Sequence, residues 1–435
     1  MAQDWIGTTY TSRVGWGHLE QLVDIGDRMA GSEGEREAAA ATSGALAAQG
    51  ARNTERREFE IQGWRRGAAS IDTQHTAHSC IALPRSPSGA VEGRLVDLGH
   101  GLPAAIDAAD VEGQVVMVAS DVPSWADRFV HRREKYYHAV AAGAAGFVFR
   151  NHIEGGLAPT GSVGTETAPI GAIPAVGVSK EVGARLARTA DGDAVTLRVD
   201  CETPKTTSQN VHADVGPETD QAVLLTCHVD AHDIAEGAVD NAAGTAMLVE
   251  LTRALRDRAS ELETRVHLLG FGAEEVGLVG SSLDATERAP ERIRAVVNLD
   301  GVVRARTLKL LTNGFDALER PARVAAGRFD HPVSVVPRMS PHSDHWPYVA
   351  RGVPGYHVKS ETTTAGRGWG HTAADTIDKL DIRDLREQAI VLTELLVQLT
   401  DGELSLPRRT PGSIADQLRA EDLAAGMQAT GDWPF

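Results

Sequence analysis

The chain has 435 residues, and its 42% hydrophobic content can fill the core of two domains or of one large domain with an insert. Its 60 acidic and 43 basic residues give a net charge of −17, which disfavours nucleic acid as a partner. The apolar runs are shorter than the roughly 18 to 20 residues that cross a bilayer, so we expect no membrane helix. No secretory signal is visible at the start of the chain, which favours a cytoplasmic protein.

Lysine and cysteine usage adds two expectations. Only six of the basic residues are lysines, and an acidic, lysine-poor surface is compatible with a salt-rich cytoplasm, although high genomic GC content would also favour arginine. Cys80, Cys201 and Cys227 lack CxxC spacing, so we expect free thiols. Cys80 and Cys201 lie at the two edges of a predicted insert, so a bridge between them stays an alternative that a cytoplasmic context disfavours.

The N-terminal part of the chain predicts helices. The segments `WGHLEQLVDIGDRM` (16–29) and `EREAAAATSGALAAQG` (35–50) are both amphipathic. Gly50 ends the second segment in the manner of a helix C-cap.

The sequence pattern changes between residues 79 and 202. Short β-type runs such as `GQVVMVAS` and `IPAVGVS` are divided by Gly, Pro and Asp turn signals, and one helical segment, `REKYYHAVAAG`, lies among them. We interpret residues 83–202 as a small β-rich domain inserted into a larger domain formed by residues 1–82 and 203–435. The basic run `RREKYY` (132–137) within it is most simply a solvent-exposed helix face.

From residue 221 onward, strand-like and helix-like segments alternate. The runs `AVLLTCHV`, `RVHLLGFG`, `RAVVNLDG` and `LKLLTNG` are extended, and `NAAGTAMLVELTRALRDR` and `GLVGSSLDATER` are helical. This alternation predicts an α/β fold with a mostly parallel mixed sheet flanked by helices on both faces. The segment 384–401 carries an apolar stripe at helical spacing that should pack on that sheet.

Three successive predicted strands end in imidazole or carboxylate side chains. In chain order these are His228 and Asp230 with the nearby Asp240, then Glu274 and Glu275, and then Asp300. The carboxyl ends of parallel strands meet at one edge of a sheet, so we expect these groups to lie together. Four or more carboxylates at one edge would repel each other unless cations neutralised them, which predicts a metal site.

The types of side chain indicate which metal. Imidazole and carboxylate without thiolate suit Zn²⁺, with Co²⁺ or Mn²⁺ as alternatives, in a catalytic site. Two ions sharing one carboxylate would use the charge fully. A further histidine should come from a later loop, and the candidates are His342, His345, His357 and His371.

Each residue also has an ordinary structural interpretation. Asp240 could cap the helix that follows it, and the pair Glu274 and Glu275 could be a solvated helix start. Asp300 could begin a turn, and His371 could be a surface loop residue. Only the occurrence of all of them together, in order, favours a metal site over these alternatives.

The motifs `HVD`, `GAVDNAAG`, `GAEEVGLVGS`, `NLDG`, `SDHWPYVARGVPG` and `GHTAADTI`, in this order, resemble the M28 family of co-catalytic zinc exopeptidases. The stretch `HVDAHDIAEGAVD` with `GVPG` is most similar to the carboxypeptidase Q-like branch of that family. The inserted segment resembles a protease-associated (PA) domain. The resemblance covers the catalytic part of the chain, and it implies a di-zinc peptidase.

Carried over by position, the resemblance implies the ligands of two metal ions. Asp240 would be shared by both ions. His228 and Asp300 would complete one site, and Glu275 and His371 would complete the other. Zinc ions held in this way would lower the pKa of a bridging water, so that a hydroxide exists at neutral pH.

The resemblance also implies roles around the ligands. Glu274 would be the general base and would pass a proton to the leaving amine. Asp230 would orient His228 by accepting a hydrogen bond from its other ring nitrogen. A cis peptide bond is expected after Asp240.

The chain departs from the family where many relatives place an oxyanion-stabilising tyrosine. Ser340 and Gly370 stand at the two corresponding positions, so His342, His345 or Tyr356 could take this role.

Three further expectations concern residues near the predicted site. His232 and Asp233 are expected to be solvated loop residues. Trp346 and Trp369 could line a specificity pocket or pack in the core. The tail after residue 406 is expected to be a linker and a short helix.

The predicted function is release of N-terminal amino acids from peptides by an aminopeptidase. The alternatives are a dipeptidase or carboxypeptidase of the same fold, a glutaminyl-cyclase-like acyl transferase with one zinc, and a non-catalytic receptor-like scaffold. The full set of ligands and Glu274 argue against the last two. Oligomeric state is left open, with a dimer as one option.

Overall fold

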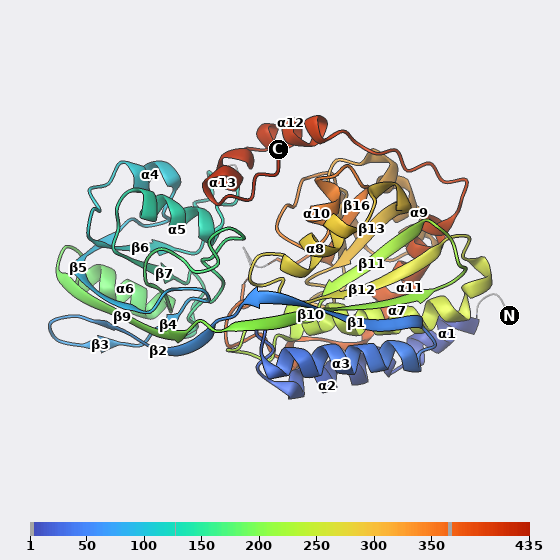
Figure 1. Ribbon diagram of the computed structural model, residues 1–435, viewed down its shortest axis with the longest axis horizontal. Coiled ribbons are helices and arrows are strands. Elements are labelled where there is room, and N and C mark those ends of the chain that lie inside the picture. Colours follow the sequence, from blue (N-terminus) through green and yellow to red (C-terminus); the bar gives the residue numbers. More distant parts are fainter. Residues whose placement is uncertain (1–3, 127, 364–367) are drawn as a thin grey trace.

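The protein consists of two lobes, each built on an eight-stranded sheet (Figure 1). The computed structural model describes residues 4–126, 128–363 and 368–435. The N-terminus lies at the outer end of the larger lobe, and the last two helices lie with the C-terminus at the top of Figure 1, between the two lobes.

The larger lobe has a mixed sheet. Its strands, in spatial order, are β1 (Arg52–Gln62), β10 (Lys205–Val215), β12 (Arg265–Phe271), β11 (Ala222–His228), β13 (Ile293–Leu299), β16 (Gly355–Ser360), β14 (Leu308–Leu311) and β15 (Val333–Val336). The central strands β12, β11, β13 and β16 run parallel, whereas β1, β10 and the β14–β16 pair are antiparallel. The predicted α/β fold class is confirmed, and each extended segment predicted from residue 221 onward is a strand.

Helices cover both faces of this sheet. Those packed on one face are α2 (Val14–Ile25), α3 (Glu33–Ala48), α7 (Ala243–Asp257) and α11 (Ile382–Thr400), with α1 (Asp4–Thr11) and α9 (Glu319–Arg328) beside α11; those on the other are α8 (Val279–Glu287) and α10 (Trp346–Val349). Strand β11 is buried along its whole length because alternate residues face the two layers: Val223 and Leu225 lie in one core cluster and Leu224 in the other. A fully buried strand ending in His228 therefore carries the first site residue.

Local sequence signals explain the helix ends. The Ser32 side chain caps α3 by accepting a hydrogen bond from the backbone N–H of Glu35, and Gly50 adopts φ +85 just after the helix, as its predicted C-cap role requires. Short helical turns complete the lobe at η1 (Ala238–Ala242), η2 (Ala259–Glu261), η3 (Pro290–Arg292), η4 (Asp316–Leu318) and η5 (Ile377–Lys379).

The smaller lobe is the predicted β-rich insert. Its strands, in spatial order, are β3 (Ala77–His78), β2 (Arg65–Asp72), β9 (Ala194–Glu202), β5 (Gly89–Asp97), β6 (Val115–Ala119), β7 (Gly146–Arg150), β8 (Ala175–Val178) and β4 (Ile81–Ala82). Its helices are α4 (Pro103–Asp107), α5 (Arg132–Ala141) and α6 (Lys180–Thr189). The strands of this sheet begin at Arg65, before the predicted start at residue 83, so we propose that the insert comprises about residues 65–202.

The basic run at residues 132–137 is not the exposed helix face that we predicted. Arg132, Lys135 and Tyr136 of α5 are buried. The Lys135 ammonium donates to the backbone carbonyls of His100, Ala119 and Asp121, each at 2.7 Å. The prediction was wrong because a long basic side chain can be buried when backbone carbonyls accept all of its donors.

The remaining expectations concern the thiols, the tail and membrane spans. All three cysteines are free, so the alternative bridge between Cys80 and Cys201 is not present. The tail forms two helices, α12 (Pro411–Ala420) and α13 (Ala424–Ala429), where we expected one. Among the residues that the structure describes, no helix combines the length and apolar character needed to cross a membrane.

We predict that Lys135→Met destabilises the protein by about 2–5 kcal/mol, because three carbonyls would lose a charged donor in a buried setting. Urea unfolding followed by circular dichroism measures the change. Lys180→Met is the matched control, because Lys180 is exposed at the start of α6 and should change stability by less than about 0.5 kcal/mol. Equal effects of the two substitutions would contradict this role of Lys135.

Candidate metal centre

The predicted site residues meet at the carboxyl edge of the parallel strands. His228 is the last residue of β11, Glu274 and Glu275 follow β12, and Asp300 follows β13. Strand β11 pairs in parallel with both β12 and β13, so these ends lie on one edge of the sheet. His371, from the loop after β16, joins them.

Two groups of side chains lie within ligand-sharing distance. His228, Asp240 and Asp300 form one group, and His232, Glu275 and His371 form the other; within each, one ligand atom per residue lies within 4.8 Å of the rest. Asp240 connects the two groups. Its Oδ1 is 3.3 Å from Nε2 of His228, and its Oδ2 is 3.0 Å from Nε2 of His371.

The side chains fit metal ions by their spacing. Two ligand atoms bound to one tetrahedral zinc ion at 2.0–2.2 Å lie roughly 3.3 Å apart. The His371–Glu275 separation is 3.3 Å, and the separations from Asp240 to His228 and His371 are similar. Oε1 of Glu275 is buried and makes no hydrogen bond with the part of the chain that the structure describes. A buried carboxylate oxygen without a donor is expected where an ion binds.

The charges of the site shift its protonation equilibria. Burial raises the pKa of Glu275 to about 7, against the opposing effect of His371, and burial raises the pKa of Glu274 well above its usual range. Burial also disfavours the charged form of Asp240, but hydrogen bonds from His228 and His371 outweigh it and hold the pKa of Asp240 well below its usual range. The protein thus stabilises the carboxylate between the two groups in its ionised form.

Asp230 holds the two adjacent glutamates through the backbone. Its Oδ1 and Oδ2 accept hydrogen bonds from the N–H groups of Glu274 and Glu275, at 3.0 and 3.1 Å. Its backbone carbonyl lies 3.1 Å from Nδ1 of His228, and its Oδ1 lies 3.5 Å from the same nitrogen. Asp230 therefore lies beside Nδ1 of His228, with its backbone carbonyl nearer to that nitrogen than the carboxylate that we expected there. Its carboxylate also fixes the position of the turn that carries Glu274 and Glu275.

Asp375 holds Asp240 in the same way, and sequence reasoning missed it. Its carboxylate accepts hydrogen bonds from the N–H groups of Val239 and Asp240, at 2.8 and 3.1 Å. The peptide between Asp240 and Asn241 is cis, as expected. The position of Asp375, four residues after His371 in `GHTAADTI`, was the one available signal.

A third buried carboxylate, Glu35, was also missed because it lies in the predicted N-terminal helix. Its oxygens accept hydrogen bonds from the Ser208 hydroxyl (2.6 Å) and from the N–H groups of Gly31 (2.6 Å) and Ala273 (3.1 Å). Ala273 has φ +57 and immediately precedes Glu274. Glu35 therefore stabilises the unusual backbone conformation of Ala273, which sets the direction in which the chain enters Glu274 and Glu275.

His232 is not the solvated loop residue that we predicted. It is 5% exposed, and its Nε2 lies 3.0 Å from Oε2 of Glu275. The neighbouring Asp233 makes a two-pronged ion pair with Arg66 of the insert, at 2.6 and 2.8 Å. The insert thus covers this loop, a contact between distant segments that local sequence does not reveal.

The three oxyanion candidates lie in different places. Tyr356 is buried in the main core and donates its hydroxyl hydrogen bond to the carbonyl of Leu318, so its hydroxyl is occupied there. His345 is fully buried at the start of α10 and packs against His357. His342 lines a cavity together with Glu274 and Glu275, and its ring stacks on that of His131 from the insert at 4.8 Å.

The two tryptophans also differ. Trp346 is 5% exposed and belongs to the main core cluster. Trp369 lies under the cationic groups of Arg304 and Lys379, at 4.7 and 5.6 Å from the ring centre.

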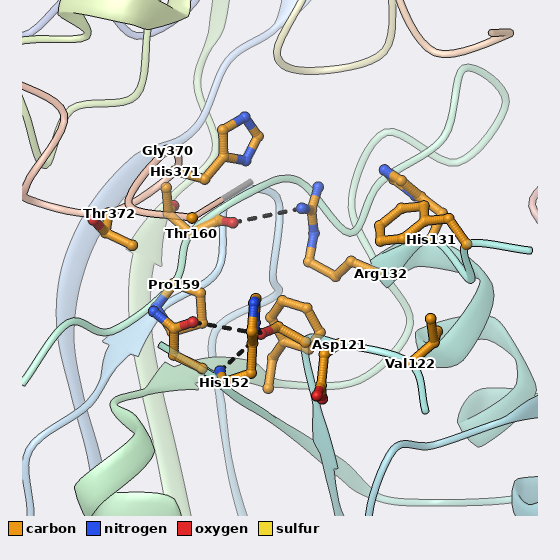
Figure 2. A pocket seen from close by; sticks show the side chains of 15 residues that line it. Asp121, Val122, His131, Arg132, His152, Pro159, Thr160, Gly370, His371 and Thr372 are labelled. Atoms are coloured by element: carbon orange, nitrogen blue, oxygen red, sulfur yellow. Dashed lines mark hydrogen bonds between the residues drawn. The ribbon is translucent and has the colours of Figure 1, made fainter. Parts of the chain in front are cut away.

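The insert borders the metal centre directly (Figure 2). The Thr160 backbone N–H donates to the carbonyl of His371 at 2.8 Å, and Arg132 reaches toward the Thr160 carbonyl. A cavity of about 150 Å³ lies on the insert side of Gly370 and His371. The His371 ring points away from this cavity, toward the metal-ligand groups.

The two lobes match two different families of known proteins. Residues 210–396 match the sequence profile "Peptidase family M28", and residues 91–186 match the profile "PA domain". Aminopeptidase YwaD of Bacillus subtilis (strain 168) is 27% identical over 330 residues, which are 72% of this chain and 67% of the relative. Leucine aminopeptidase 2 of Trichophyton rubrum is 27% identical over 56% of this chain and 48% of the relative.

The fold is that of a solved relative. The structure of BSAP, a zinc aminopeptidase from Bacillus subtilis, aligns with 89% of this chain and 94% of its own, with a TM-score of 0.69 at 22% identity. Both curated relatives are longer than the part matched here, and the chain spans about half to two thirds of their length. The larger lobe thus matches peptidase family M28 over residues 210–396, where the ligand set at the sheet edge lies, and the insert matches a PA domain over residues 91–186.

Proposed function

We propose that this protein is a two-metal aminopeptidase that releases single residues from the N-termini of peptides. The main support for two metal ions is the position of the Asp240 carboxylate, whose two oxygens face histidines of two separate ligand groups. The names of the curated relatives support aminopeptidase activity, and the solved protein with the same fold is a zinc aminopeptidase.

Each ligand group would hold one of the two ions. His228 and Asp300 would hold one ion, Glu275 and His371 would hold the other, and Asp240 would bind both. When bound, the two ions supply Lewis acidity, which polarises the scissile carbonyl and acidifies the attacking water.

Glu274 is the proton carrier in this proposal. Its carboxylate is half-buried next to the metal ligands, and the loss of solvent around it raises its pKa well above its usual range. A carboxylate with a raised pKa accepts a proton from water and returns it to the leaving amine at neutral pH. The hydrogen bond from the Glu274 N–H to Asp230 keeps the residue in place during both transfers.

His342 is the remaining oxyanion donor. It lines the same cavity as Glu274, whereas His345 and Tyr356 are buried in the core. The presence of both ligand groups argues against a one-zinc cyclase and against a receptor-like scaffold. A cytoplasmic location, adaptation to high salt and a dimer rest on the sequence alone and stay predictions.

We predict that Glu274→Gln lowers kcat by about 10²- to 10⁴-fold, because glutamine cannot accept the proton. Zinc-loaded protein is incubated with one peptide in free and N-acetylated forms, and mass spectrometry follows the products. Wild type should remove single N-terminal residues from the free form only. Release from the C-terminus, or cleavage of dipeptides alone, would replace the aminopeptidase assignment with one of the alternatives.

We predict that Asp375→Asn weakens metal binding by about 10- to 100-fold, because one of the two N–H groups that fix Asp240 would lose its acceptor. Competition with a chromogenic zinc chelator measures the affinity. Asp378→Asn is the control, since Asp378 lies in the same loop region with its side chain 75% exposed and should bind zinc as wild type does. An unchanged affinity in Asp375→Asn would show that this support is dispensable.

A further inference from the structure

His232 is a buried imidazole whose two nitrogens make no hydrogen bond with the described residues. Burial of an unpaired polar group is costly, so each such group in a folded protein needs an explanation. Nε2 lies 3.0 Å from Oε2 of Glu275, and the His232 and His371 rings meet edge to face with centroids 4.5 Å apart. The ring is thus held against two of the residues that would bind the second ion.

The space between these side chains has the size of a single ion. A cavity of about 10 Å³ is lined by His232, Asp240, Glu275 and His371, together with residues of the neighbouring loops. This volume is close to that of one water-sized sphere. The spacing of 3.0 Å between His232 and Glu275 is also close to the roughly 3.3 Å expected between two ligands of one zinc ion.

We propose that His232 is a metal ligand, so that the ion at Glu275 and His371 is bound by two imidazoles and two carboxylates. The inference rests on the proposed function and deepens it. The other ion has one imidazole, from His228, with Asp240 and Asp300. The two positions are therefore chemically unequal, and we expect the ion with four protein ligands to be bound more tightly than the ion with three.

The test compares metal binding in wild type, His232→Ala and His232→Gln. Zinc titration against a chromogenic chelator should show two affinities in wild type. The tighter one should fall by more than about 100-fold in both variants, a larger loss than a residue outside the ligand set would cause. X-ray absorption at the zinc edge should count three imidazole ligands per two zinc ions in wild type and two imidazole ligands per two zinc ions in the variants.

His331→Ala is the control, since His331 is a buried histidine that contacts the Arg306 carbonyl, and it should bind zinc normally. Circular dichroism of the metal-free proteins shows whether the variants are folded. Two imidazoles in wild type, or unchanged affinity in the folded variants, would overturn the assignment of His232. Failure of wild type to bind two ions would instead overturn the proposed function.

The insert-side cavity supports a second inference, which comes from a different observation. Its walls include the apolar side chains of Val122, Phe129, Phe149 and Pro159. The cavity is also lined by polar and charged side chains that have partners around it: the Ser120 hydroxyl lies 2.7 Å from the His152 ring, Asp121 lies 3.0 Å from the His100 ring, and Arg132 donates to the Ser162 carbonyl. Phe129 is an apolar side chain left 48% exposed at this cavity.

We infer that this cavity receives an apolar side chain of the peptide substrate, and this too rests on the proposed function. A volume of about 150 Å³ is large enough for a group the size of benzene, and four of the lining side chains are apolar. His371 lines both this cavity and the one that contains Glu274, so the two cavities adjoin at a residue of the metal centre. The insert would therefore select the substrate.

The test measures kcat/KM for the p-nitroanilides of phenylalanine and alanine. Wild type should prefer phenylalanine. Val122→Phe, which fills the cavity from its edge (Figure 2), should lower the preference by at least about tenfold, whereas Val122→Ala should not lower it. Trp125→Ala is the control, because Trp125 is 72% exposed and does not line the cavity.

An equal loss on both substrates in Val122→Phe would overturn the cavity inference. Absence of cleavage of either substrate by zinc-loaded wild type would count against the proposed function instead. The inhibition constants of L-phenylalanine and L-alanine give a second measurement of the same preference. Wild type should bind L-phenylalanine more tightly than L-alanine, and Val122→Phe should reduce this difference.

Discussion

The carboxylate of Asp240 is the link on which the site depends. It lies between His228 on one side and His371 on the other, at 3.3 and 3.0 Å, and both histidines favour its ionised form. The Asp240 side chain is 12% exposed, and an ionised group so largely removed from water is stabilised by the opposite charges that it meets on both sides. The carboxyl groups of Glu274, Glu275 and Asp300 crowd the same edge, and bound cations would neutralise the charge that these groups carry when they are ionised.

Hydrogen bonds from the backbone hold the segments that carry the metal ligands in place. Three carboxylates accept hydrogen bonds from backbone N–H groups of the segments that carry the ligands; they belong to Asp230, Asp375 and Glu35. These hydrogen bonds fix the segments before any ion arrives, which is the arrangement that metal sites need for affinity. The insert adds a further support, because Thr160 binds the carbonyl of His371 and Arg66 binds Asp233.

Sequence reasoning predicted the central sheet and the polar residues at its strand ends. The strands that end near His228, Glu274 and Asp300 were predictable because each is an apolar run followed by polar residues, and parallel strands bring such ends together. The burial of His232 and Lys135 was not predictable. His232 contacts Glu275 and His371, which are far away in the chain, and Lys135 depends on backbone carbonyls, so neither leaves a local pattern. Glu35 looked like an ordinary residue of a helix first turn.

The two-ion arrangement around Asp240 is tested most directly by anomalous diffraction at the zinc edge from crystals of the zinc-loaded protein. Our proposal predicts two peaks, one beside His228 and Asp300 and one beside Glu275 and His371, with the Asp240 carboxylate between them. A single peak, or two peaks that do not share Asp240, would contradict it.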